Sequence, residues 1–381
     1  MNNKSIKLAD LIFLTICGIL LLIPCCKIDF SKKIYGGKTY LKDFPSLYKK
    51  NNFNFNIGQD FDAWLGSRFF TKNELKKIYN MFSCSMNINY CINGYKVFDK
   101  KNSVIYQKTF WGYQKDNRAE IANSIQELNN WCKKRNIKLY ILIIPSRANF
   151  IKYNTPNKKL KFSEDSAEKI VKYAKTHTDA NIIFPYDELK TANRKSLVYF
   201  KTDHHWTQTG AYIGYRALME EIKKDFPEIF ILNENNLTTS KNKLVKGLFD
   251  RKYDGGSMLK YSGFPEFYEK KLLTEDYLYY TTPLKSNLKI TNQSDLPYFN
   301  SETDYIFRYN GENKRRAILI GDSFTSNLSV FLPYSFREVV SLLDNYRRFN
   351  FKEYEKIITV YEPDIIIVNM RTAWIDIFNN F

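Results

Sequence analysis

The hydrophobic pattern of the chain changes at residue 117, and from there helical periodicity alternates with continuous apolar runs. In "NRAEIANSIQELNNWCKKRN", the residues Ile121, Ile125, Leu128 and Cys132 form one stripe of an amphipathic helix. The next segment, "IKLYILIIP" at 137–145, is apolar almost without a break. Such a run is typical of a strand that is covered on both faces.

The same patterns continue to the end of the chain. They predict further helices at 163–175, 186–193 and 207–226, and further strands at 181–185, 196–200, 315–324 and 364–370. Strands that alternate with helices predict an α/β fold, namely a parallel sheet with helices on both faces. The stretch at 227–312 interrupts the alternation because it is polar, rich in tyrosine and weakly periodic. We interpret it as an inserted irregular region with a few short strands.

Before residue 117 the periodicity is weaker. A helix is predicted at 61–80, and a pair of strands around the turn "DKKN" at 95–106. The expected organisation has three parts: a signal anchor or signal peptide at 1–29, an N-terminal wrapping segment at 30–115, and an α/β domain at 116–381 that carries the insertion.

The N-terminal run "LIFLTICGILLLIPCC" at 11–26 comes close to the length of a membrane span. As a helix it would reach about 24 Å, slightly short of a hydrocarbon core of about 30 Å. No small-x-small cleavage site follows, and Pro24 before Cys25 fits a lipoprotein cleavage site poorly, so we favour an uncleaved membrane anchor. Lysines after the run weaken the positive-inside signal. A buried N-terminal helix is the alternative.

Composition narrows the class of protein without identifying it. The 381 residues are 44% hydrophobic and 16% aromatic, which suits a large packed core and excludes a disordered chain. A net charge of +18 would suit nucleic acid, anionic lipid or an acidic polymer. The lysines are spread along the chain, and no zinc finger, RNP motif or basic zipper occurs, so nucleic-acid binding is not expected. The cysteines leave open a Cys84–Cys91 disulfide or buried thiols.

The stretch "AILIGDSFTSN" at 317–327 places a serine where α/β proteins often bind ligands. A buried strand ends at Ile320, and Gly321 permits a tight turn. Asp322 and Ser323 then follow at the carboxyl end of the strand, where a helix should begin. The Ser323 N–H at a helix start could stabilise a developing negative charge. The tripeptide by itself is also an ordinary turn sequence.

Two of the three histidines of the chain stand side by side in "FKTDHHWTQTG" at 200–210. A serine nucleophile needs a base, which is usually a histidine steadied by a carboxylate. In an extended segment residues i and i+2 point the same way, so Asp203 and His205 would share a side. His204 would face away in a supporting role. The third histidine, His177, follows a helix in a polar turn.

This cluster has two other interpretations. The histidines could cap the helix that begins near residue 207 or hydrogen-bond inside the core. Asp203, His204 and His205 could also be zinc ligands. Adjacent histidines on a strand diverge, however, and no second cluster of ligands at suitable spacing occurs in the sequence, so no metal is expected.

Together, "TDHHWTQTGAY" and "ILIGDSFTSN" resemble the SGNH hydrolase-like domain of the alginate O-acetyltransferase family, in the group named for its DHHW signature. That family places its Asp-x-His before its Gly-Asp-Ser, and this chain has the same order. The resemblance spans about residues 58–375. It implies an SGNH-hydrolase-like fold in which Ser323 is the nucleophile, His205 the general base and Asp203 its orienting partner.

The resemblance also implies a function. The chain would be an extracytoplasmic acyltransferase that moves an acetyl group to the hydroxyls of a polysaccharide through a serine acyl-enzyme, without a cofactor. A membrane-bound O-acyltransferase partner would supply the acetyl group. Two alternatives stay open: an acetyl esterase with the same triad, and a non-catalytic glycan-binding scaffold.

Several further residues are candidates for supporting or substrate-binding roles. The family often has Asp-Lys after its first buried strand, where this chain reads "PSRANF", so Arg147 either replaces that lysine or is an ordinary surface arginine. Arg371 and Asn369 are candidates for a second oxyanion donor, and core or salt-bridge roles are their alternatives. Asp322, like His204, is a candidate for a substrate-binding or supporting role.

Overall fold

The computed structural model describes residues 11, 12, 14, 15, 18, 44–49, 52–68, 91–92, 96–99, 104–107, 116–147, 150, 167–200, 205–242, 277–344 and 350–380. Two compact units are present, one of Met1–Ile88 with Phe249–Lys271 and one of Asn89–Leu248 with Leu272–Phe381. Within the described part of the chain, no helix combines the length and the apolar character needed to cross a membrane. The boundaries expected at 29 and 115 stay predictions.

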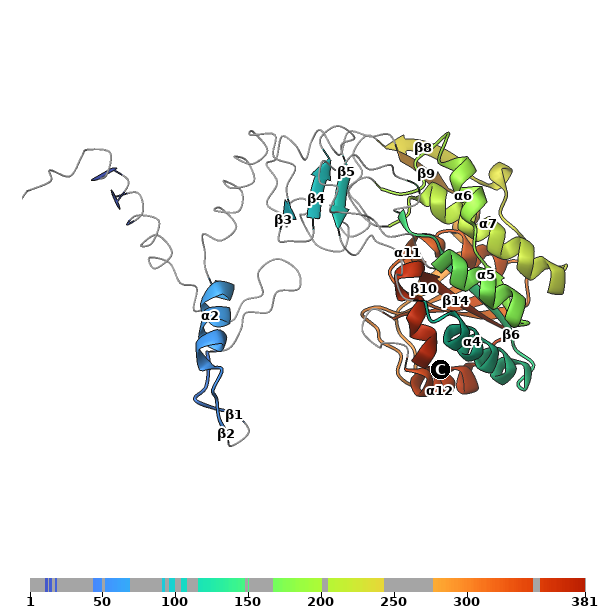
Figure 1. The fold of residues 1–381 in the computed structure, drawn as a ribbon. Helices are drawn as coiled ribbons and strands as arrows, with labels where there is room; N and C mark the ends of the chain where they lie inside the picture. The colour runs from blue at the N-terminus through green and yellow to red at the C-terminus, as the bar shows by residue number, and fades with distance from the viewer. Residues whose placement is uncertain are drawn as a thin grey trace, which may run out of the picture. The chain divides into compact units, whose positions relative to one another are not determined.

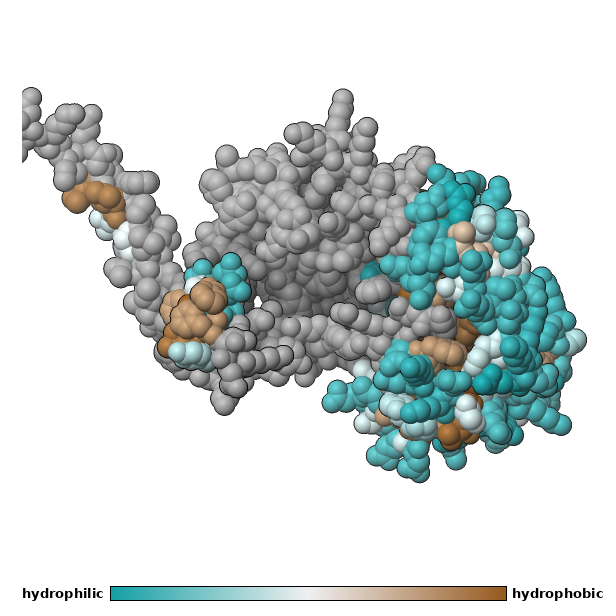
Figure 2. Space-filling model, turned by 60° about the horizontal axis from the view of Figure 1, so that its bottom comes forward, coloured by the Kyte–Doolittle hydropathy of each residue, from teal (hydrophilic) through white to brown (hydrophobic). Residues whose placement is uncertain are grey.

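The first unit holds a small hairpin and one helix. Strands β1 (Tyr48–Lys49) and β2 (Asn52–Phe53) pair antiparallel, and helix α2 spans Ile57–Arg68. Phe44 and Phe61 pack their rings on Trp64, with centroid distances of 5.0 and 5.5 Å. Apolar side chains gather at the surface of this unit (Figure 2). The helix expected at 61–80 is thus confirmed as far as its described residues extend.

The second unit is built on a seven-stranded mixed sheet in the order β10-β11-β13-β12-β14-β6-β7 (Figure 1). Five neighbouring strands are parallel, from β13 to β7. Strands β10 and β11 extend the sheet antiparallel at one edge. The strands are β6 (Lys138–Ile144), β7 (Asn181–Ile183), β10 (Leu288–Thr291), β11 (Tyr305–Tyr309), β12 (Arg316–Gly321), β13 (Glu338–Leu343) and β14 (Ile365–Arg371).

Helices cover both faces of this sheet, as the sequence predicted. Residues of α4 (Arg118–Lys133), α5 (Ala167–His177) and α12 (Phe351–Tyr361) pack in one apolar cluster. Residues of α6 (Tyr186–Ala192), α7 (Gln208–Asp225) and α11 (Thr325–Leu328) pack in the other. Successive residues of β14 alternate between the two clusters, because strand side chains point to opposite faces in turn.

Shorter elements complete the described part of this unit. Strands β3 (Cys91–Ile92), β4 (Lys96–Asp99) and β5 (Val104–Gln107) form an antiparallel sheet, which confirms the strand pair expected at 95–106. Strands β8 (Thr238–Asn242) and β9 (Tyr277–Thr281) pair antiparallel. The 3-10 helices are η4 (Glu234–Asn236), η5 (Pro283–Asn287), η6 (Leu332–Ser335) and η7 (Thr372–Asn380).

The structure corrects three expectations about the sheet. It is mixed rather than purely parallel, because the end of the 227–312 region supplies the two antiparallel edge strands β10 and β11. Strand β13 was not expected from the sequence, although its "EVVSLL" is largely buried. The strand expected at 196–200 is absent from the sheet, and a single bridge joins Tyr199 to Trp206 instead.

The structure shows the state of one cysteine among the described residues. Cys132 is a buried free thiol on α4 in the apolar cluster. Burial disfavours the thiolate and raises the pKa of this group to about 12. Cys84 lies outside the described residues, so its pairing with Cys91 stays untested.

Candidate active site

Three parallel strands deliver candidate side chains to the same edge of the central sheet. Ser323 follows β12, Arg147 follows β6, and Arg371 ends β14. These strands are neighbours in the order β12-β14-β6, and their carboxyl ends lie together because they run parallel. The carboxyl edge of an open α/β sheet is the usual ligand-binding edge.

The turn after β12 exposes Ser323 between buried neighbours. Gly321 and Asp322 before it and Phe324 after it are all buried, whereas Ser323 is partly exposed. Asp322 forms the turn because its Oδ1 accepts a hydrogen bond from the Phe324 N–H at 3.0 Å. A side chain at position 321 would place its Cβ 2.3 Å from the Asn369 carbonyl oxygen, so this approach of two strands requires glycine.

The helix expected directly after this turn is shorter and later than predicted. Helix α11 begins at Thr325 and ends at Leu328, a single turn. Its dipole therefore contributes less at Ser323 than a full helix would. The Ser323 backbone N–H nonetheless donates to no other group among the described residues, which leaves it available to an anionic oxygen.

Residues 198–200 and 205–207, the described ends of the histidine segment and here called the histidine loop, are joined by backbone hydrogen bonds. The Phe200 N–H donates to the His205 carbonyl at 3.1 Å, and the Thr207 N–H donates to the Val198 carbonyl at 2.9 Å. Thr207 then caps α7, because its hydroxyl oxygen accepts a hydrogen bond from the Gly210 N–H.

This loop brings His205 to Ser323. The His205 Nε2 lies 2.7 Å from the Ser323 Oγ, although the two residues are 118 positions apart. The imidazole is 1% exposed and packs against the Phe324 ring at a centroid distance of 4.9 Å. By contrast, His177 ends α5, is exposed and stacks on Tyr173. A hydroxyl within hydrogen-bond reach of an imidazole is the geometry that activates a serine nucleophile.

Two further hydrogen bonds hold the same segments together. The Trp206 Nε1–H donates to the Phe324 carbonyl at 3.1 Å, and the Asn327 Nδ2–H donates to the Trp206 carbonyl at 2.8 Å. Trp206 and Asn327 are both buried. The indole packs so closely on α7 that a Cβ added at Gly214 would lie 2.6 Å from it. Neither Trp206 nor Asn327 was expected from the sequence to support the site. The Trp-Asn clamp (Trp206 and Asn327) therefore ties the residue next to His205 to the segment that follows Ser323.

We expect Asn327→Ala to lower the rate of ester cleavage by about tenfold or more and to lower stability by about 1–3 kcal/mol. The reason is that the buried Trp206 carbonyl would lose its donor and the histidine loop would lose one of its two fixed points. The rate on p-nitrophenyl acetate and the thermal unfolding midpoint measure the two effects.

Ser329→Ala is the matched control for this variant. It removes a hydrogen bond of the same short segment, from the Ser329 Oγ–H to the Thr325 carbonyl at 2.9 Å, without touching Trp206. A loss of stability with an unchanged rate in Asn327→Ala would mean that the clamp supports the fold but does not position His205.

Arg147 lies in the interior, so its interpretation as an ordinary surface arginine is wrong. It is 2% exposed, and its Nε–H donates to the Phe200 carbonyl at 2.8 Å. Nearby, the Tyr199 hydroxyl donates to the Pro145 carbonyl at 2.6 Å. The base of the histidine loop is therefore tied to the end of β6, which favours a supporting role for Arg147.

Asp322 and Arg371 form a pair beside the nucleophile. The Asp322 Oδ2 accepts a hydrogen bond from the Arg371 N–H at 3.3 Å and lies 3.8 Å from the Arg371 Nε. Burial raises the pKa of the Asp322 carboxyl, whereas the Arg371 guanidinium and two backbone N–H groups oppose that shift. The carboxyl builds the turn and holds the end of β14.

Asn369 is fully buried directly beside Gly321 in the sheet register. Neither its Nδ2 nor its Oδ1 has a hydrogen-bond partner among the described residues. Strand alternation places its side chain on the face that α7 covers, the face of Ile365 and Ile367. Its role as a second oxyanion donor, like that of Arg371, stays a prediction.

Two predicted site residues cannot be placed, because Asp203 and His204 lie outside the described residues. The Ser-His-Asp constellation is therefore seen for its serine and histidine only. Within the described ranges, no group of three or more histidine, cysteine, aspartate or glutamate side chains is arranged to hold a metal ion.

Comparison with known proteins places this geometry in a family. Residues 106–345, well over half of the chain, match the family model described as "SGNH hydrolase-like domain, acetyltransferase AlgX". The resemblance based on the two motifs is thereby confirmed. No sequence among curated proteins matches the chain.

Solved structures show the same fold. PatB1 from Bacillus cereus is 18% identical with a TM-score of 0.53, over 74% of this chain and 99% of that chain. The same protein with a sulfonyl adduct is 17% identical with a TM-score of 0.53, over 74% and 96%. A DHHW family protein from Eubacterium siraeum DSM 15702 is 16% identical with a TM-score of 0.54, over 76% and 96%. At these identities the likeness establishes the fold alone.

Proposed function

The chain belongs to the family of SGNH hydrolase-like acetyltransferase domains that includes AlgX, and from this premise we propose that it transfers acetyl groups to polysaccharide hydroxyls through an acyl-enzyme on Ser323. The observation that carries the proposal is the 2.7 Å contact between the His205 Nε2 and the Ser323 Oγ. A partly exposed hydroxyl beside a buried imidazole can react with an incoming ester.

In the first half-reaction Ser323 accepts the acetyl group. His205, protonated on Nδ1, takes the hydroxyl proton on Nε2 while Oγ attacks the carbonyl carbon of the donor ester. The Ser323 N–H would stabilise the resulting oxyanion. When the tetrahedral intermediate collapses, the leaving group receives the proton from His205, and an acetyl ester on Ser323 remains. Asp203 would hold the Nδ1–H and stabilise the imidazolium.

In the second half-reaction the acceptor takes the acetyl group. A sugar hydroxyl gives its proton to the His205 Nε2 and attacks the acetyl carbon. Collapse of the second intermediate breaks the bond to Oγ, and His205 returns the proton to Ser323. The result is an acetylated glycan and free enzyme. Water in place of the sugar would make the same enzyme an esterase.

The setting that we propose is the extracytoplasmic side of the membrane, with the N-terminal run at 11–26 as the anchor. The apolar character of that run supports this location. Acetyl groups would come from a membrane-bound O-acyltransferase partner, which an anchored enzyme could meet at the membrane surface. We keep the domain at 116–381 as the catalytic part in this scheme.

The test is acetyl transfer from p-nitrophenyl acetate, with and without a glycan acceptor. We expect slow release of p-nitrophenol alone, faster release with a suitable oligosaccharide, and a product that is heavier by one acetyl group in the mass spectrum. Release without any transfer product would instead identify an esterase. No release, together with no covalent labelling of Ser323 by phenylmethylsulfonyl fluoride, would leave a non-catalytic glycan-binding protein.

A further inference from the structure

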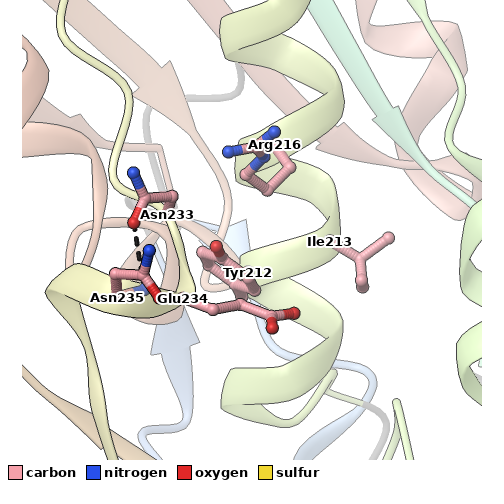
Figure 3. Close-up of a pocket in the computed structure, with 6 residues that line it drawn as sticks. All are labelled: Tyr212, Ile213, Arg216, Asn233, Glu234 and Asn235. Atoms are coloured by element: carbon pink, nitrogen blue, oxygen red, sulfur yellow. Dashed lines mark hydrogen bonds between the residues drawn. The ribbon is translucent and has the colours of Figure 1, made fainter.

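A polar groove lies between α7 and the turn around η4. It has a volume of about 500 Å³, which lies within the range of ~300–1,000 Å³ typical of small-molecule sites. One wall is helix α7 and the other is the turn around η4, and Figure 3 shows the side chains of both walls. The lining residues are Tyr212, Ile213, Arg216, Asn233, Glu234 and Asn235.

The groove offers hydrogen-bonding groups of both kinds. Glu234 presents a carboxylate, which only accepts, while the amides of Asn233 and Asn235 can donate. The Asn233 Oδ1 already accepts from the Asn235 N–H at 2.9 Å, so its NH₂ group is the part left for a ligand. Among the described residues, neither the Glu234 carboxylate nor the side-chain amide of Asn235 forms a hydrogen bond. Sugar hydroxyls both donate and accept, and they match this set.

The charge of the groove decides which sugars fit. The Arg216 guanidinium is paired with Glu220 at 2.8 Å and also donates to the Leu232 carbonyl at 3.4 Å. The Arg216 guanidinium is thus already engaged by groups outside the groove lining. The Glu234 carboxylate, by contrast, has no ion-pair partner among the described residues and is the charged group left to meet a ligand. A uronate would meet a like charge here, although the chain as a whole carries +18. Uncharged sugars meet no such repulsion.

The groove rests on the segments that carry the proposed catalytic residues. The Tyr212 ring packs on Phe331 at 5.3 Å and on Tyr280 of β9 at 5.6 Å. Phe331 belongs to the segment that follows Ser323, and α7 begins three residues after His205. From Gln208 to Arg216 the helix rises by about 12 Å. The groove thus runs along α7 at a distance from the helix start that a short oligosaccharide can bridge.

The turn that forms the second wall is rigid. Asn233 caps η4 with its side chain, and the Asn236 side chain accepts a hydrogen bond from the Asn233 N–H at 3.1 Å. The Glu234 side chain extends from this closed turn toward α7 (Figure 3). A preformed wall lowers the entropic cost of binding a ligand.

We infer that this groove is a subsite for the acceptor glycan and that it takes uncharged sugar residues rather than uronates. The inference rests on the proposed function, because the acceptor is a glycan only if the chain acetylates one. It names the chemical class of the acceptor near the reacting sugar and assigns Glu234 and Asn235 the role of holding it.

The test measures binding by calorimetry to full-length Ser323→Ala protein, which binds without turnover. The probes are maltohexaose, cellohexaose and chitohexaose, which are uncharged, and a mannuronate hexamer, which is anionic. We expect at least one uncharged hexamer to bind better than the mannuronate hexamer. Adding Glu234→Gln and Asn235→Ala should weaken that binding at least tenfold. The turn should persist, because neither side chain takes part in the cap.

The matched control carries Glu127→Gln and Asn130→Ala on α4, an exposed pair on the opposite face of the sheet. It should bind like the parent. The inference is overturned if no uncharged hexamer binds, if the mannuronate hexamer binds best, or if the groove variant binds as the control does. Binding without any transfer in the Ser323-containing enzyme would keep the groove and reject the acyltransferase, whereas transfer without groove binding would do the reverse.

Discussion

Ser323→Ala is expected to lower acetyl transfer at least about a thousandfold while leaving the fold intact. The hydroxyl is the atom that would carry the acetyl group, and no other residue can supply its oxygen in the 2.7 Å contact with His205. The turn itself does not depend on this hydroxyl, because it is held by the Asp322 carboxylate and by the hydroxyl of Thr325. The variant should therefore lose its transfer rate and keep the thermal unfolding midpoint of the parent.

Ser326→Ala is the control for this variant. It removes an exposed hydroxyl three residues further along, and it should keep both the rate and the midpoint. Mass spectrometry after a pulse of p-nitrophenyl acetate adds a direct reading. The parent should carry one acetyl group on the peptide that contains Ser323, and the variant none. A variant that still transfers acetyl at the parent rate would end the acyl-enzyme proposal.

Much of the sheet could be predicted because its strands are buried on both faces. The apolar runs of β6, β12 and β14 stand out as continuous, and the helices between them show a clear stripe. The short strands expected within 227–312 could not be located in the sequence, because β10 and its neighbour β11 are covered less completely than the central strands. The residues of β10 and β11 mix polar and aromatic types, so the hydrophobic pattern of these strands resembles that of a loop.

The candidate catalytic residues could be predicted from the sequence, but the residues that hold them in place could not. Histidine is rare in this chain, so the pair beside an aspartate drew attention, and the meeting of His205 with Ser323 is observed. No sequence pattern marks Asn327, whose value depends on facing the Trp206 carbonyl across two segments. The same holds for Arg147, because burial of an arginine depends on the tertiary fold rather than on its neighbours in the sequence.

The second large effect is expected when the proposed general base, His205, is removed. His205→Ala should lower acetyl transfer about a thousandfold or more, since the Ser323 hydroxyl would lose the imidazole that takes its proton. The buried ring leaves a cavity beside Ser323 when it is removed. Added imidazole should enter that cavity and restore part of the rate, which a merely structural loss would not allow.

His204→Ala is the comparison that assigns the role. We expect alternation along an extended segment to turn the side chain of His204 away from that of His205, so its loss should cost less than about tenfold, and imidazole should not restore it. The rate of p-nitrophenyl acetate cleavage is measured for both variants, with and without imidazole at about 50 mM, a concentration that suits a weak ligand. These rates rank the two histidines. If His204→Ala is the more damaging change and the one that imidazole rescues, the base is His204, and the 2.7 Å contact of His205 with Ser323 is structural.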